Sequence, residues 1–156
     1  MSARAAPLGT LPRRGFSLID TMVALAVTAI VASVALPNYQ QSVRKSRRAD
    51  AVQALSAVLQ AQERWRSQHD AYADDLTDLG LTAASPGERY ELDLIGIGSP
   101  PAFVHGFEIR ARPLPGAGQD KDAECSEMTI RLQGGRIIYL AANSDGADTT
   151  GRCWPR

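Results

Sequence analysis

The segment RRGFSLIDTMVALAVTAIVASVALPNYQ, residues 13–40, sets the interpretation of the whole chain. Its central run, Phe16 to Leu36, contains no Lys, Arg or Glu but carries one aspartate, Asp20. As a helix rising about 1.5 Å per residue, the run would cover roughly 30 Å, the thickness of a bilayer's hydrocarbon core. The segment therefore predicts a membrane-spanning helix with a carboxylate near its start.

A secretory signal peptide and a plain membrane anchor are the two simpler interpretations of this run. A signal peptide would be cut after a small-x-small motif, and Ser33-Val34-Ala35 provides one, so that cleavage would follow Ala35. The run is longer than the roughly 7 to 15 apolar residues of a signal peptide, however, and Asp20 lies within it. An anchor explains the length but gives Asp20 no role.

Asp20 has a local and a functional interpretation. Ser17 could cap the helix, and Asp20, three residues later, could complete a capping box at its positive end. Placing a carboxylate inside lipid also costs up to about 3 kcal/mol unless the carboxylate pairs with a cation. Cleavage between Gly15 and Phe16 would create such a cation, a free α-amine on the same chain or on a neighbouring copy.

Length, composition and charge limit what the rest of the chain can be. With 156 residues, 44% of them hydrophobic, the chain suffices for one membrane segment and one small folded module. A formal net charge of +0 argues against the whole-molecule positive field typical of nucleic-acid-binding proteins. Any basic patch must therefore be local.

Cys125 and Cys153 both follow the apolar run. In an exported domain they would form a disulfide worth roughly 3 to 4 kcal/mol, and the alternative is two free thiols. Basic residues flank the run on both sides, so charge alone does not orient it. A disulfide would place the C-terminal part on the oxidising side of the membrane and the N-terminus in the cytoplasm.

Helical spacing resumes after Pro37 and continues to about Gln68, which predicts one long helix from Ser17. Pro37 cannot donate a hydrogen bond to the carbonyl of Ser33, so we expect a kink or local melting over residues 33–37. The helix should carry one broad apolar face. The opposite, polar face is expected to hold Arg47, Arg48, Asp50, Glu63 and Arg64.

The remaining sequence predicts a small sheet. Tyr72 to Leu81 should form a short helical turn that ends at Gly80. Gly134-Gly135 is a two-residue hairpin signal between the last two strands, whereas 96–102, 113–118 and the tail 143–154 should be irregular. The four predicted strands are Arg89 to Ile95, Phe107 to Arg112, Ser126 to Gln133 and Arg136 to Ala141.

The residues 13–20, RRGFSLID, resemble the processing signal of type IV prepilins. The resemblance implies that a prepilin peptidase removes residues 1–15 by cutting between Gly15 and Phe16, and that the same enzyme N-methylates Phe16. It also implies that Asp20, the fifth mature residue, pairs with the α-amine of an adjacent subunit, and that Pro37 is the family's mid-helix proline. Two positions differ from the usual pattern, because the acid is usually Glu and a glycine often stands where this chain has Ala29.

The resemblance further implies the α+β fold of type IV pilins, a long N-terminal helix packed on a small antiparallel sheet of about four strands. Residues 16–36 would be the transmembrane and filament-core helix, and 37–69 its amphipathic continuation. Residues 70–156 would form the C-terminal β domain, with a disulfide-bounded region at 125–153. The phrases YADDLTDLGL and CW make PilE-like minor pilins the most similar group.

The expected function is that of a pilus subunit, a minor pilin that acts in adhesion, twitching motility or DNA uptake. The implied partners are other pilin subunits, the peptidase and methyltransferase, the inner-membrane assembly platform and, before assembly, membrane lipid. The protein would span the inner membrane once, with its C-terminal domain periplasmic, and then enter an extracellular filament. The alternatives are a pseudopilin of type II secretion and a soluble exported binding protein or enzyme cut after Ala35.

No catalytic constellation, cofactor motif or metal-site spacing is evident, so we expect neither an enzyme nor a metalloprotein. His69 and His105 are isolated and should lie at the surface. Oxygen atoms near Gly146, from Asn143, Asp145 and Asp148, could bind calcium, which would favour the pseudopilin, but a solvated turn is the simpler interpretation.

One basic cluster remains, consisting of Arg44, Lys45, Arg47 and Arg48. It could contact anionic lipid, a neighbouring subunit or DNA, or simply form a solvated helix face. No aromatic residue alternates with these charges, so lipid or a subunit is favoured over nucleic acid.

Overall fold

The computed structural model describes residues 17–155. The expected leader, the cleavage site at Gly15 and the methylation site at Phe16 lie outside these residues. Contacts divide the chain into two compact units, Met1–Tyr39 and Gln40–Arg156, and each is described by itself.

The first unit contains the beginning of helix α1, Leu18–Arg66. Ser17 and Asp20 cap it, since the Ser17 backbone N–H donates to Asp20 Oδ2 at 3.1 Å and Ser17 Oγ accepts the N–H of Ile19 at 3.4 Å. This is the expected reciprocal capping arrangement. Residues 33–37 remain helical, so local melting does not accompany the hydrogen bond lost at Pro37, and a kink there stays a prediction.

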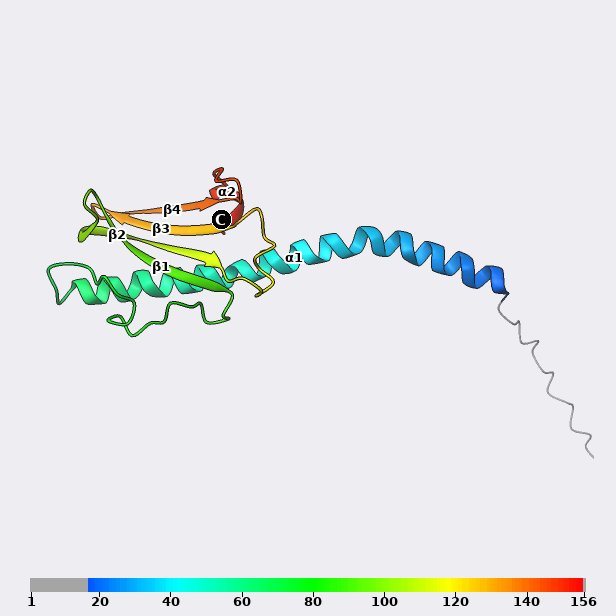
Figure 1. Ribbon diagram of the computed structural model, residues 1–156, viewed down its shortest axis with the longest axis horizontal. Helices are drawn as coiled ribbons and strands as arrows, with labels where there is room; N and C mark the ends of the chain where they lie inside the picture. Colours follow the sequence, from blue (N-terminus) through cyan, green and yellow to red (C-terminus); the bar gives the residue numbers. More distant parts are fainter. Residues whose placement is uncertain (1–16, 156) are drawn as a thin grey trace, which may run out of the picture. The chain divides into compact units, whose positions relative to one another are not determined.

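In the second unit, the remainder of α1 lies along one face of a four-stranded antiparallel sheet (Figure 1). The strands are β1 Tyr90–Ile97, β2 Ala102–Pro113, β3 Glu127–Gln133 and β4 Arg136–Ala142, in the order β1-β2-β3-β4. The expected α+β architecture with four strands is confirmed. Consecutive hairpins generate this order, and sheet formation needs no crossover.

Three strands are longer than predicted, β4 by one residue at Ala142 and β1 and β2 mainly at the turn that joins them. Residues 96–102 were expected to form a loop, but β1 continues to Ile97 and β2 begins at Ala102. Only residues 98–101 remain for the turn, where Gly98 takes a φ of 97°. The hairpin between β3 and β4 agrees with its prediction, because Gly134 and Gly135 have φ values of 56° and 77°, as a tight turn of this length requires.

The core forms where the predicted apolar face of α1 meets the inward side chains of the sheet. Alanines and branched residues of α1, together with large side chains of the three strands β1 to β3, are almost fully buried. The main members are Ala51, Leu55, Val58, Tyr90, Phe107, Ile109, Met128 and Ile130. Small residues on the helix allow it to approach the sheet closely.

The connection between α1 and β1 is irregular but anchored. The Gln62 side chain bonds to both the N–H and the carbonyl of Ala73, each at 2.9 Å. The segment predicted as a short helical turn is a turn without helix assignment, in which the N–H of Leu81 donates to the carbonyl of Leu76 at 2.9 Å. Gly80, with a φ of 70°, ends it as predicted.

Candidate functional site

The exposed apolar part of α1 is the first candidate functional feature. Its large side chains are open to the surroundings, with Leu18 81% exposed and Ile30 67% exposed. An 18-residue window has a mean hydropathy of 2.1, so by length and composition the helix could cross a membrane. Its hydroxyl groups are satisfied internally, because Thr28 Oγ1 donates to the Ala24 carbonyl and Ser33 Oγ to the Ile30 carbonyl, each at 2.7 Å. Such a surface suits lipid or another apolar helix.

Asp20 is the one charged residue on this exposed segment, from Ser17 to Val43. Its Oδ2 atom accepts the Ser17 N–H. Within residues 17–155, no hydrogen bond or ion pair to its Oδ1 atom is present. The Oδ1 atom can therefore accept a hydrogen bond from a donor outside the described residues.

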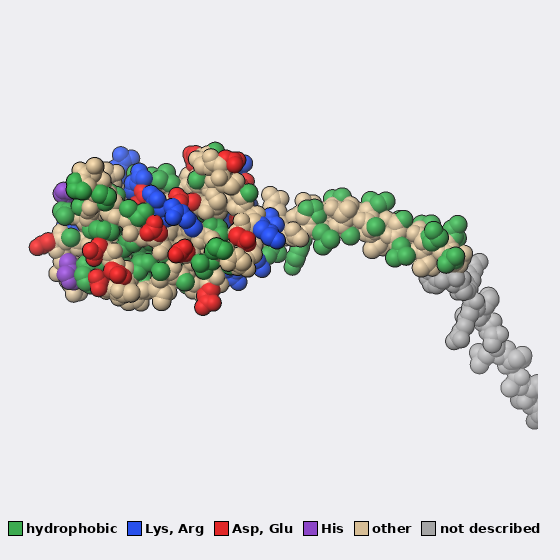
Figure 2. All heavy atoms as spheres, viewed as in Figure 1, with side chains coloured by type: hydrophobic (Ala, Val, Ile, Leu, Met, Phe, Trp, Pro, Cys, Tyr) green, Lys and Arg blue, Asp and Glu red, His purple; other side chains and the backbone are tan. Residues whose placement is uncertain are grey.

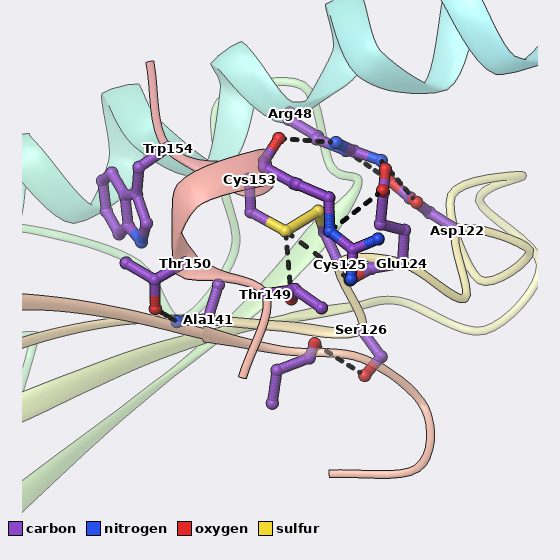
Figure 3. Close-up of a disulfide and its surroundings, with 12 residues drawn as sticks. Arg48, Asp122, Glu124, Cys125, Ser126, Ala141, Thr149, Thr150, Cys153 and Trp154 are labelled. Atoms are coloured by element: carbon purple, nitrogen blue, oxygen red, sulfur yellow. Dashed lines mark hydrogen bonds and ion pairs between the residues drawn. A yellow bond between two sulfur atoms is a disulfide. The ribbon is translucent and has the colours of Figure 1, made fainter. Parts of the chain in front are cut away.

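Arg48 differs from the rest of the basic cluster because it is buried and paired with acidic side chains. The sequence placed it on the open polar face of the helix, and that expectation is wrong, because the residue is only 5% exposed. Its Nε atom donates to Asp122 Oδ2 at 2.7 Å and its NH2 group to Asp122 Oδ1 at 2.8 Å, a bidentate pair (Figure 3). The NH2 group also donates to Glu124 at 2.9 Å.

The surroundings of Arg48 hold its positive charge in place. Burial alone would lower the pKa of Arg48, but the hydrogen bonds to Asp122 and Glu124 raise that pKa above its ordinary value. Gln119 extends the cluster, since its Nε2 atom donates to Asp122 Oδ2 at 2.9 Å and to the carbonyl of Arg44 at 3.1 Å. The loop before β3 is thus tied to α1 by charged and neutral hydrogen bonds.

The other three members of the basic cluster differ from Arg48. Lys45 is exposed, while Arg44 and Arg47 are half-buried. Within the described part of the chain, no acidic group lies within ion-pair distance of any of the three. They are available to lipid, a subunit or another anionic partner.

The disulfide between Cys125 and Cys153 is present, with 5.8 Å between the two Cα atoms. It holds a short helix that the sequence did not indicate, α2, Thr150–Cys153, beside the end of β4 (Figure 3). The Thr149 N–H donates to the Ala141 carbonyl at 2.9 Å, and Thr150 Oγ1 accepts the Ala141 N–H at 2.9 Å. The tail is thereby fixed to an edge strand whose backbone would otherwise be open.

A groove of about 340 Å³ separates the tail from α1 within the second unit. We call it the helix–tail groove, and its main lining residues are Lys45, Ala49, Val52, Arg152, Trp154 and Pro155. The Trp154 ring is fixed there, because its Nε1 atom donates to the Leu140 carbonyl at 2.8 Å. Sequence reasoning missed this feature, since the tail carries no periodic pattern.

The oxygen atoms considered for calcium have local partners. Asn143 Oδ1 accepts the N–H groups of Asp145 and Ala147 at 3.0 and 2.7 Å. Asp148 Oδ1 accepts the hydroxyl and N–H of Thr150, and these bonds lower the pKa of Asp148. Among residues 17–155 no group of three or more His, Cys, Asp or Glu side chains could hold a metal ion. The arrangement is that of a hydrogen-bonded turn.

The outer face of the sheet carries a network of ion pairs. Glu108 is buried between Arg110 and Arg131, and Arg112 pairs with Glu127 at 2.8 Å. Burial would raise the pKa of Glu108, but the two arginines lower it overall. The outer face of the sheet is therefore not a free basic patch.

Charged side chains of both signs gather over the second unit, whereas the visible side of the first carries mainly hydrophobic ones (Figure 2).

The two histidines lie at the surface as expected, and both are exposed. The ring of His69 stacks on Trp65, with 3.8 Å between the ring centroids.

Comparison with known families gives two matches that follow one another along the chain. Residues 11–36 match the prokaryotic N-terminal methylation motif. Residues 37–129 match a family described as type IV minor pilin ComP, DNA uptake sequence receptor. The two matches together cover the long helix, strands β1 and β2 and the beginning of β3.

Several curated proteins are similar to the chain. The type IV major pilin protein PilE1 of Neisseria gonorrhoeae is 30% identical over 86% of this chain and 72% of its own length. The type IV major pilin protein PilA of Myxococcus xanthus (strain DK1622) is 35% identical over 49% of this chain, and the fimbrial protein EcpC of Eikenella corrodens is 29% identical over 49%. The matches cover only 34% of PilA and 50% of EcpC, so the chain spans about a third to a half of the length of these two relatives.

Proposed function

This chain belongs to the type IV pilin family, and on that premise we propose that it is a minor structural subunit of a type IV pilus. One observation carries the proposal. A single helix, α1, combines an exposed apolar segment with a segment packed on a sheet, and the two family matches meet within it at residues 36 and 37. The first segment would leave the membrane for a filament core, and the second would carry the folded domain.

Processing is the first step of the proposed function. A prepilin peptidase would remove residues 1–15 at the Gly15-Phe16 bond and methylate Phe16, in agreement with the methylation motif matched over residues 11–36. The subunit would then be delivered to the inner-membrane assembly platform. The disulfide supports an N-terminus in the cytoplasm and a C-terminal domain in the periplasm, because such bonds persist in oxidising compartments.

The proposed roles follow the segments of the chain. Residues 16–36 form the membrane and filament-core helix, 37–69 its amphipathic continuation, and 70–156 the domain exposed on the filament. Asp20 is the assembly carboxylate, and the α-amine of Phe16 on a neighbouring subunit is its first partner. Pro37 is the site at which the helix can bend when it moves from lipid to filament.

DNA uptake is the second candidate function, which the description of the matched family favours. Any DNA contact would have to use local cations, because acidic side chains slightly outnumber basic ones over residues 40–156. Arg44, Lys45 and Arg47 are candidates, since they lack acidic partners among the described residues. Adhesion and motility need no such patch.

The other interpretations are less well supported. A pseudopilin of type II secretion was linked to a calcium site, and the oxygen atoms near Gly146 serve a turn instead. A soluble protein cut after Ala35 would not require the methylation motif. The pilin family is structural, so an enzymatic role is not proposed.

Mass spectrometry of the mature N-terminus tests the proposal. In cells with an active prepilin peptidase, the purified filament fraction should contain this chain beginning at N-methylated Phe16. A mature chain that begins at Leu36, or an uncut chain in the same cells, would contradict it.

A further inference from the structure

The helix–tail groove is a preformed apolar surface with an open side. Lys45, Ala49 and Val52 follow one another at helical spacing, so they form one strip along α1, and the first two are exposed. Trp154 and Pro155 form the opposite wall. This wall is held away from the helix by three contacts. Trp154 donates a hydrogen bond to the Leu140 carbonyl, packs edge-on against Tyr139 and follows the disulfide-bonded Cys153.

The charge at the rim of the groove is not balanced within the described chain. Arg48 also lines the groove, but Asp122 and Glu124 neutralise it. Arg152 lies 3.5 Å from the same Glu124. Lys45 has no acidic partner among residues 17–155. The groove is thus complementary to an apolar ligand that carries one negative charge.

This chain contains a ligand of that kind. The segment Leu18 to Leu36 is apolar and exposed along its length, and Asp20 is its one charged residue. We propose that the helix–tail groove receives this segment from a second copy of the chain, with Asp20 of the incoming copy paired to Lys45. The proposal rests on the filament assembly proposed above and names a contact by which copies would associate.

The register of the two helices supports this pairing. Copies inserted in the membrane with the same orientation have parallel helices. Placing Asp20 of one copy beside Lys45 of the other therefore offsets the two helices by 25 positions, roughly 37 Å along the helix axis. The same offset places Ala24 beside Ala49 and Val27 beside Val52. Small side chains at the first contact let the helix backbones approach, and two valines form an apolar contact one turn farther.

The pairing is compatible with an α-amine partner for the same carboxylate. An ionised Asp has two oxygen atoms and about four acceptor sites, of which Ser17 occupies one. An ammonium group of Lys45 and an α-amine can therefore both bind Asp20. Loss of Lys45 removes one of the two cations, whereas loss of Asp20 removes both pairs.

Cysteine cross-linking in filaments assembled with this chain in excess, so that copies are neighbours, tests the proposal without changing either charged residue. A chain carrying Ala24→Cys and Ala49→Cys should give disulfide-linked dimers under mild oxidation. The new thiols are separated by about 37 Å on their own helix, too far for a bond within one chain. The natural cysteines do not interfere, because Cys125 and Cys153 are bonded to each other.

Matched controls define the outcome. Ala24→Cys combined with Gln60→Cys, an exposed position three turns farther along α1, should give no dimer, and neither should Ala24→Cys alone. Lys45→Glu in the cross-linking chain should lower the dimer yield roughly fivefold, about the effect of one ion pair. Lys121→Glu, at another exposed lysine, should leave the yield unchanged.

The contrary results are equally distinct. Filaments that contain the double-cysteine chain without dimers, or with equal dimers in the Gln60 control, would overturn the groove contact but not the proposed function. Co-purification of an anionic phospholipid that depends on Lys45, without dimers, would identify the groove as a lipid site and overturn it as well. Absence of the wild-type chain from filaments would overturn both proposals.

Discussion

The guanidinium of Arg48 on α1 binds both carboxylate oxygens of Asp122, at 2.7 and 2.8 Å, although the two residues are 74 positions apart in the sequence. The same guanidinium donates to the carbonyl of Arg152 at 3.3 Å. One side chain therefore ties the helix to the loop before β3 and to the disulfide-bonded tail. This clamp shapes the surface that the folded domain presents beside α1.

Replacing Arg48 with Ala should lower the free energy of unfolding by about 3 to 5 kcal/mol, because two carboxylates would remain partly buried without their cation. Urea denaturation of the full chain in detergent micelles would measure the loss. Arg47→Ala is the matched control, since no acid lies near Arg47 within residues 17–155, and it should cost less than about 1 kcal/mol. Equal losses in the two variants would contradict the clamp.

Removal of the disulfide by Cys125→Ser with Cys153→Ser should cost about 2 to 5 kcal/mol, as is typical for native disulfides of small exported domains. The expected change in the midpoint of urea denaturation should also appear when the wild-type protein is reduced with dithiothreitol. The double-serine variant provides the control, because the reductant should leave its midpoint unchanged. A wild-type midpoint that does not respond to reduction would exclude a structural role for the bond.

Tyr90 should make the domain sensitive to alkaline pH. Burial raises the pKa of its phenol to about 12, from an ordinary value near 10. The contribution of the neutral phenol to stability is therefore fully present below pH 10 and is lost as the pH rises through 12. Denaturation midpoints measured from pH 8 to pH 12 should fall less steeply for Tyr90→Phe, whereas Tyr139→Phe, on a half-exposed residue, should follow the wild type.

Gly106 is required by the close approach of β2 and β3. A Cβ atom at this position would collide with the backbone carbonyl of Leu132, so Gly106→Ala should cost at least about 3 kcal/mol. Gly116→Ala is the control, because Gly116 has a φ of 80° but no atom within 4 Å of its would-be Cβ. It should cost only about 1 to 2 kcal/mol of backbone strain. Thermal denaturation would rank the two variants, and a reversed order would argue against the packing described.

Asp20 should control incorporation into filaments. Asp20→Ala should reduce the amount of this chain in purified filaments at least about tenfold, which corresponds to about 1.4 kcal/mol. Asp20→Glu keeps the charge and should retain incorporation, while Asp20→Asn keeps the size and should not. Quantitative immunoblotting of filament and membrane fractions would separate failed assembly from failed expression, and unchanged incorporation of the alanine variant would leave the helix with an anchoring role alone.

Features that depend on neighbouring residues could be predicted from the sequence. The capping pair Ser17 and Asp20, the hairpin at Gly134-Gly135 and the buried face of α1 all follow from spacing of a few residues. Strand limits were less accurate at residues 96–102, because cross-strand pairing with β2 extended β1 through Gly96. Local pattern carries no information about such pairing.

The sequence by itself determined that this chain has a long, partly membrane-compatible helix, a small antiparallel sheet and one cysteine pair, since periodicity, turn residues and composition are local properties. Only the tertiary structure decided that Arg48 is buried and Lys45 is exposed, although both belong to one run of basic residues. The difference arises because Asp122, Glu124 and the tail fold over one side of the helix and leave the other side open. Contacts across 74 to 104 positions depend on how the loops return to α1, which helical spacing alone does not encode.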